Sequence, residues 1–149
     1  MNLPNDAPGA EAPKKSTSSQ PFDTSGPKLR ILLVEDHVDT AVILGRLLRK
    51  MGHEVTTANT VATALQAADE QFRTSGIDLV ISDVGLPDGS GLDLMRTLST
   101  KYRVRGISLS GFGMDTDIAQ SKAAGFSRHL IKPIDVGLLF RAIAGIAWD

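Results

Sequence analysis

The apolar residues of this chain fall into short runs, and their spacing changes from one run to the next. Short apolar or alternating runs bounded by turn residues are typical of strands. The expected strands cover residues 29–34, 53–58, 79–83, 106–109 and 127–131. Between the strands, apolar residues recur every three or four positions, which is the spacing of an amphipathic helix. Helices are therefore expected to begin at or directly after residues 39, 60, 90, 115 and 135.

Residues at the ends of these segments support the helix assignments. Thr60 and Asp135 stand where a side chain could cap the first turn of a helix. Gly52, Gly76 and Gly125 stand where helices would end, and glycine readily adopts the left-handed conformation found there. Strands that alternate with helices in this way predict an α/β fold, a doubly wound parallel sheet joined by right-handed crossovers.

The first 28 residues differ in composition from the rest of the chain. Five of the seven prolines lie in this stretch, with Leu3 and Phe22 as essentially its only large apolar residues. Burial of so few apolar groups cannot offset the entropy that ordering would cost. We therefore expect a disordered leader or linker over residues 1–28 and one domain over residues 29–147.

Composition narrows the classes of protein that fit. The formal net charge of −1 mixes both signs, which gives no general attraction to nucleic acid. The absence of cysteine excludes disulfides and thiolate metal sites. No apolar run approaches the roughly 18 residues of a membrane span, and the first residues lack the apolar centre of a signal peptide. We expect a cytoplasmic domain that contacts neither nucleic acid nor membrane directly.

Charged residues follow three of the expected strands. Glu35 and Asp36 come after the first strand, Asp83 ends the third, and Lys132 comes after the last. In an open α/β sheet, ligands bind in the crevice outside the carboxyl ends of the strands, so these side chains should converge. Three clustered carboxylates repel one another unless a cation joins them, and Mg2+ uses few protein carboxylates while sharing its other positions with phosphate oxygens. The pattern predicts a magnesium site.

Four segments at strand ends carry a family resemblance. They are LLVEDH (32–37), VISDVGLPDGSGLDLM (80–95), ISLSGFG (107–113) and AGFSRHLIKPID (124–135). In this combination and order, residues 29–147 resemble a response-regulator receiver domain, most closely the receivers attached to hybrid histidine kinases. The resemblance implies a (βα)5 flavodoxin-like fold with the five-stranded order 2-1-3-4-5.

The resemblance also implies a role for each acidic residue. Asp83 would be the phosphoacceptor, a carboxylate nucleophile that forms an aspartyl phosphate, and it would also bind the metal. Asp36 would bind Mg2+ directly, and Glu35, where an aspartate is more usual, would act through a metal-bound water. The backbone carbonyl of Gly85 would complete the protein ligands. Without this chemistry, the same acids would be ordinary capping and turn residues.

Three further residues would act on the phosphoryl group or respond to it. By resemblance, Lys132 would pair with a phosphate oxygen as a compact charge, and the hydroxyl of Ser110 would donate to another oxygen. His129 stands where many receivers have the Tyr or Phe that turns inward on phosphorylation. We interpret it as a half-buried aromatic substitute, and a proton-sensitive role is the alternative. His37 and His53 lack the spacing of zinc ligands.

Together these features predict a phosphoacceptor signalling domain. It would take a phosphoryl group from a histidine kinase or a histidine phosphotransfer domain and switch a surface that an unknown downstream protein recognises. It would catalyse its own phosphorylation without being a turnover enzyme. A phosphorylation-independent pseudo-receiver is the alternative. A nucleotide- or flavin-binding domain ranks last, because neither GxGxxG nor GxxxxGK[ST] follows the first strand.

The resemblance implies that Gly85 and Phe112 would lie beside the path along which water attacks the phosphoryl group. Gly85 has no side chain and Phe112 has no hydrogen-bonding group, so neither can orient an attacking water. We therefore expect the phosphoryl group to persist rather than to be lost quickly.

Overall fold

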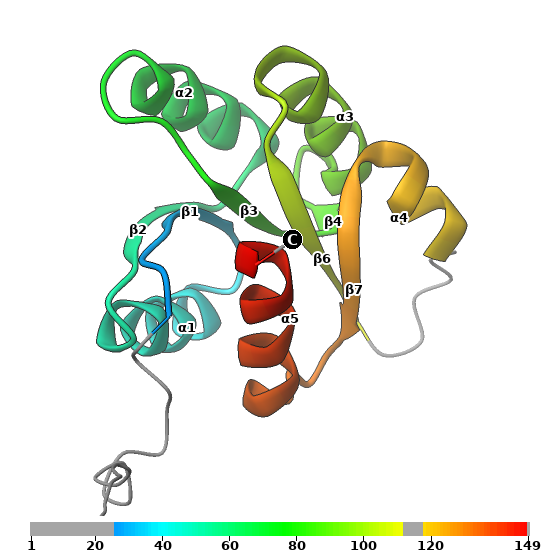
Figure 1. The fold of residues 1–149 in the computed structure, drawn as a ribbon. Coiled ribbons are helices and arrows are strands. Elements are labelled where there is room, and N and C mark those ends of the chain that lie inside the picture. The colour runs from blue at the N-terminus through cyan, green and yellow to red at the C-terminus, as the bar shows by residue number, and fades with distance from the viewer. Residues whose placement is uncertain (1–25, 112–117, 149) are drawn as a thin grey trace, which may run out of the picture.

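A computed structural model describes residues 26–111 and 118–148 of the chain, and the side chains up to residue 147. Its main sheet has five parallel strands in the order β2-β1-β3-β6-β7 (Figure 1). The strands are β1 (Arg30–Val34), β2 (Glu54–Ala58), β3 (Leu79–Asp83), β6 (Arg105–Ser110) and β7 (Phe126–Ile131). Because β6 and β7 are the fourth and fifth strands of this sheet, the predicted doubly wound fold and the strand order 2-1-3-4-5 are confirmed.

Helices cover both faces of the sheet (Figure 1). They are α1 (Val38–Lys50), α2 (Val61–Phe72), α3 (Gly91–Tyr102), α4 (Ile118–Ala124) and α5 (Val136–Trp148). Successive residues of β1 point to opposite faces, as the pleat requires. Ile31 and Leu33 belong to the core beneath α1 and α5. Leu32 and Val34 belong to the core beneath α2, α3 and α4. The central strands β1, β3 and β6 are buried on both faces, and of their residues only Arg30 and Arg105, which begin β1 and β6, reach solvent.

The expected helix ends are confirmed by specific contacts. Thr60 caps α2, since its hydroxyl accepts a hydrogen bond from the backbone N–H of Thr63. The Asp135 carboxylate accepts one from the N–H of Leu138 at 3.1 Å. Gly52 and Gly76 follow α1 and α2 with φ of 98° and 86°, the left-handed conformation that glycine adopts without strain.

The structure adds one element that the sequence did not predict. Directly after β3, the two-residue strands β4 (Gly85–Leu86) and β5 (Gly89–Ser90) pair antiparallel as a small hairpin. It lies between Asp83, the last residue of β3, and the start of α3.

Some predictions fall outside the described residues. Residues 1–25 and Phe112 lie there, so the leader and the lifetime of the phosphoryl group stay predictions. The helix expected from residue 115 is described only from Ile118. Across the described ranges, none of the helices combines the length and the apolar character that crossing a membrane requires.

Gly91 is the place where α3 meets the end of β3. A Cβ atom built on Gly91 would lie 1.9 Å from the carbonyl oxygen of Asp83, so this position has no room for a side chain. The N–H of Gly91 also donates to the carbonyl of Val84 at 2.7 Å. This close approach fixes the first turn of α3 directly behind Asp83.

We expect Gly91→Ala to destabilise the fold by about 1–3 kcal/mol or more, the usual cost of forcing extra atoms into a packed site. Gly89→Ala, two residues earlier in the small hairpin, is the matched control. Its Cβ would meet only a methyl group of Val61 at 3.4 Å, an ordinary contact. Urea unfolding of both variants measures the difference. Equal stability of the two variants would contradict the steric argument.

Candidate functional site

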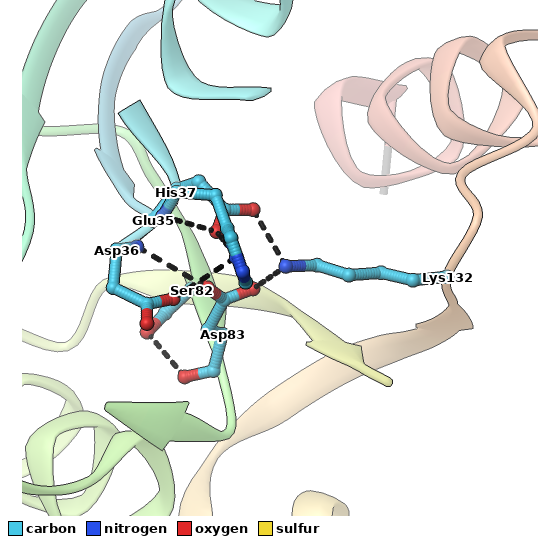
Figure 2. Close-up of polar contacts among 6 residues, drawn as sticks. All are labelled: Glu35, Asp36, His37, Ser82, Asp83 and Lys132. Atoms are coloured by element: carbon cyan, nitrogen blue, oxygen red, sulfur yellow. Dashed lines mark hydrogen bonds and ion pairs between the residues drawn. The ribbon is translucent and has the colours of Figure 1, made fainter. Parts of the chain in front are cut away.

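The carboxyl edge of the sheet brings four charged residues together (Figure 2). Glu35 and Asp36 follow β1, Asp83 is the last residue of β3, and Lys132 follows β7. These residues are far apart in the sequence, and they meet because parallel strands end on the same side of a sheet.

Lys132 joins two of the carboxylates. Its Nζ lies 2.7 Å from Oε1 of Glu35 and 2.7 Å from Oδ1 of Asp83. The two carboxylate side chains are 0% and 4% exposed. Burial by itself would lower the pKa of Lys132, but the hydrogen bonds with Asp83 and Glu35 outweigh it and raise that pKa. A cis peptide bond links Lys132 to Pro133.

The two buried carboxyl groups differ in how readily they ionise. Burial, and then the hydrogen bond and the charge of Glu35, raise the pKa of Asp83 to about 8 against the opposing effect of Lys132. Burial would also raise the pKa of Glu35, but its hydrogen bonds with Asp83, Lys132 and the His37 backbone outweigh this and lower it. One ammonium group therefore does not balance both acids, and Asp83 tends to keep a proton.

The donor set fits a hard divalent cation. Asp36 is partly exposed beside the pair, and its backbone N–H lies 3.4 Å from Oδ2 of Asp83. Three carboxylates around one lysine leave excess negative charge, and their oxygens are the ligands that Mg2+ prefers. Gly85 comes two residues after Asp83, at the start of the small hairpin, and its pairing with Ser90 fixes its backbone. Glu35, Asp36, Asp83 and the carbonyl of Gly85 are thus the groups that could hold the ion.

His37 is a neighbour of the acids that sequence reasoning did not place there. Its Nδ1 lies 3.3 Å from Oε2 of Glu35 and 3.5 Å from Oδ1 of Asp36. The backbone N–H of His37 also donates to Oε2 of Glu35 at 3.1 Å. Its position directly after the two acids was the available signal. His53, in contrast, is buried before β2, where its Nδ1 accepts a hydrogen bond from the N–H of Leu29.

Ser110 ends β6, the neighbour of β3 in the sheet, and its side chain contacts His129 on β7. Oγ of Ser110 is 3.1 Å from Nε2 of His129. On the other side of the ring, Nδ1 is 2.6 Å from Oγ of Ser108 and 3.5 Å from Oγ of Ser121. His129 is half-buried, and burial lowers its pKa. The ring therefore connects β6, α4 and β7.

Sequence reasoning missed the two buried serines in this network. Ser108 stands two residues before Ser110, so both side chains share one face of β6. That spacing was a usable signal for Ser108. Ser121 comes from α4, and its contact with Ser108 at 3.3 Å depends on how this helix packs on the sheet.

The sequence is similar to those of known signalling proteins. The two-component response regulator ARR11 of Arabidopsis thaliana is 34% identical over 106 residues, which are 71% of this chain and 20% of that protein. The aerobic respiration control sensor protein ArcB of Escherichia coli is 40% identical over 76 residues, 51% of this chain and 9% of that protein. The chain thus spans a fifth or less of the length of these curated relatives.

A solved structure and a family model are also similar to this chain. The crystal structure of a response regulator receiver domain protein from Clostridium thermocellum superposes with a TM-score of 0.73 at 28% identity, covering 80% of this chain and 94% of that one. Residues 31–144 match the family model described as response regulator receiver domain. The chain belongs to the response regulator receiver domain family.

Proposed function

We propose that this receiver domain accepts a phosphoryl group on Asp83, with Mg2+, from the phosphohistidine of a histidine kinase or a histidine phosphotransfer domain. The observation that carries the proposal is the buried Asp83 carboxylate, held 2.7 Å from Lys132 Nζ beside two further acids. The proposed domain spans residues 29–147, with residues 1–28 as a leader or linker. Family membership supports the phosphoacceptor role.

The proposed step exchanges one bond to phosphorus for another. An ionised oxygen of Asp83 forms a P–O bond while the P–N bond to the donor imidazole breaks. The imidazole leaves with the bonding electron pair and takes up a proton. Bound Mg2+ would supply positive charge that favours ionised carboxylates and offsets charge on the phosphoryl oxygens. Lys132, already in contact with Asp83, adds a positive charge on the other side.

Ser110 and His129 are the proposed switch. The hydroxyl of Ser110, which contacts the His129 ring, would turn towards the new phosphoryl group and donate to it. His129 would then lose one contact and keep those with Ser108 and Ser121. Because Ser121 belongs to α4, the change would reach the surface formed by α4, β7 and α5. A downstream protein would recognise that surface.

Mg2+ binding should depend on Asp36. Titration of the protein with MgCl2 should shift the backbone amide resonances of residues 35–37 and 83–86, and Asp36→Ala should abolish these shifts because a direct ligand is lost. Asp39→Ala is the control, since Asp39 is a nearby exposed acid in the first turn of α1. Equal Mg2+ affinity of Asp36→Ala and the parent would show that the ligand assignment is wrong.

Phosphorylation should occur at one residue. With a small phosphodonor and Mg2+, intact mass spectrometry should show one added phosphoryl group in the parent and none in Asp83→Asn. Asp93→Asn, which changes an exposed acid of α3, should be modified as the parent is. Modification that survives Asp83→Asn would refute the nucleophile assignment, and a parent that takes no phosphoryl group would favour the pseudo-receiver alternative.

The contact between Ser110 and His129 should change when Asp83 is phosphorylated. We expect the Nε2 nitrogen resonance of His129 to shift on addition of phosphodonor and Mg2+, since its hydrogen-bond partner turns away. Asp83→Asn under the same conditions is the control and should show no shift. A His129 resonance that stays constant while Asp83 becomes phosphorylated would rule out this switch.

A further inference from the structure

Asp88 makes a long-range contact that the proposed chemistry does not use. It lies in the turn of the small hairpin, between Leu86 and Gly89. Its Oδ1 accepts a hydrogen bond from the N–H of Val61 at 2.7 Å, and its Oδ2 accepts one from the N–H of Ala62 at 3.0 Å. One carboxylate therefore binds the first two backbone N–H groups of α2. Asp88 follows Val61 by 27 positions and Ala62 by 26 positions in the sequence.

These hydrogen bonds complete the capping of α2. The first N–H groups of a helix have no partner within the helix. Thr60 serves only part of this need, since its hydroxyl accepts from Thr63 N–H at 3.0 Å. Asp88 supplies the acceptors for the two preceding N–H groups, and its negative charge suits the positive end of the helix. The same hydrogen bonds, from Ala62 and then Val61, lower the pKa of Asp88.

The hairpin that Asp88 holds also carries Gly85. Gly85 pairs with Ser90, and the base of the hairpin is fixed by the hydrogen bond from Gly91 N–H to the Val84 carbonyl. Leu86 packs against the core, so the hairpin has an apolar anchor as well. Gly85 itself has no side chain with which to hold its position. The contact of Asp88 with α2 fixes the far end of the hairpin.

We propose that Asp88 is a positioning residue for the metal site. By tying the hairpin to the start of α2, it holds the Gly85 carbonyl in the direction that a cation shared with Asp36 and Asp83 requires. The inference rests on the proposed function, because it assumes that this carbonyl is a ligand. Coupling between two sites is reciprocal, so Mg2+ binding should in turn stabilise the contact of Asp88 with α2.

Asp88→Ala tests this proposal against Thr60→Ala. Both variants remove exposed capping contacts from the same turn of α2, but only Asp88 belongs to the hairpin. In MgCl2 titrations followed by amide resonances, we expect Asp88→Ala to bind Mg2+ about tenfold more weakly than the parent, as is common when a residue that orients a ligand is lost. Thr60→Ala should bind as the parent does.

A second readout does not depend on metal affinity. In the metal-free protein, the amides of Gly85, Leu86 and residues 88–90 should exchange with solvent faster in Asp88→Ala than in the parent or in Thr60→Ala. In the parent, saturating MgCl2 should slow exchange of the Val61 and Ala62 amides, and Asp88→Ala should lose this response. These two measurements separate positioning of the hairpin from general weakening of α2.

Four outcomes would overturn the inference. Unchanged Mg2+ affinity in Asp88→Ala, while Asp36→Ala loses it, would refute the role of Asp88 and leave the proposed function intact. Equal weakening in Thr60→Ala would assign the effect to the stability of α2. A parent that binds no Mg2+ would refute the proposed function and this inference together. If the amide exchange rates of Val61 and Ala62 in the parent do not change with Mg2+, the proposed coupling is wrong. This outcome is decisive even if Asp88→Ala fails to fold.

Discussion

The contact of Lys132 with Glu35 and Asp83 is the interaction on which the rest of the site depends. It joins the ends of β1, β3 and β7, which are three of the five parallel strands. Buried charges are tolerated only where they are paired, because removal from water costs far more than an unpaired group can recover. The lysine makes it possible for two carboxylates to lie almost without exposure at the sheet edge, where they and Asp36 offer oxygens that could hold a cation.

Two hydrogen-bond networks lie on different sides of this contact. On one side, the His129 ring joins Ser110 on β6 to Ser121 on α4. On another, the hairpin after β3 reaches the start of α2 through Asp88. Hydrogen bonds hold both networks, and Leu86 gives the hairpin an apolar anchor as well. The apolar cores on the two faces of the sheet hold the strands in place.

The fold was predictable because its signals are local. Alternating spacing of apolar residues, the capping Thr60 and glycines such as Gly52 each act within a few positions, and the structure agrees with them. The small hairpin escaped prediction because Gly85–Leu86 and Gly89–Ser90 are too short for a periodic pattern to be visible. The family resemblance, rather than spacing, supplied the strand order that the structure confirms.

The sequence by itself determined which residues end the strands, and hence that Glu35, Asp36, Asp83 and Lys132 would share one edge of a parallel sheet. Only the tertiary structure decided which of them pair, because hydrogen bonds depend on side-chain directions and distances that no spacing rule contains. The contacts of Ser121 with His129 and of Asp88 with Val61 were likewise decided by the tertiary structure, because the two residues of each pair lie on separate elements. Strand periodicity is a property of neighbouring residues, whereas these contacts arise from the way separate elements pack together.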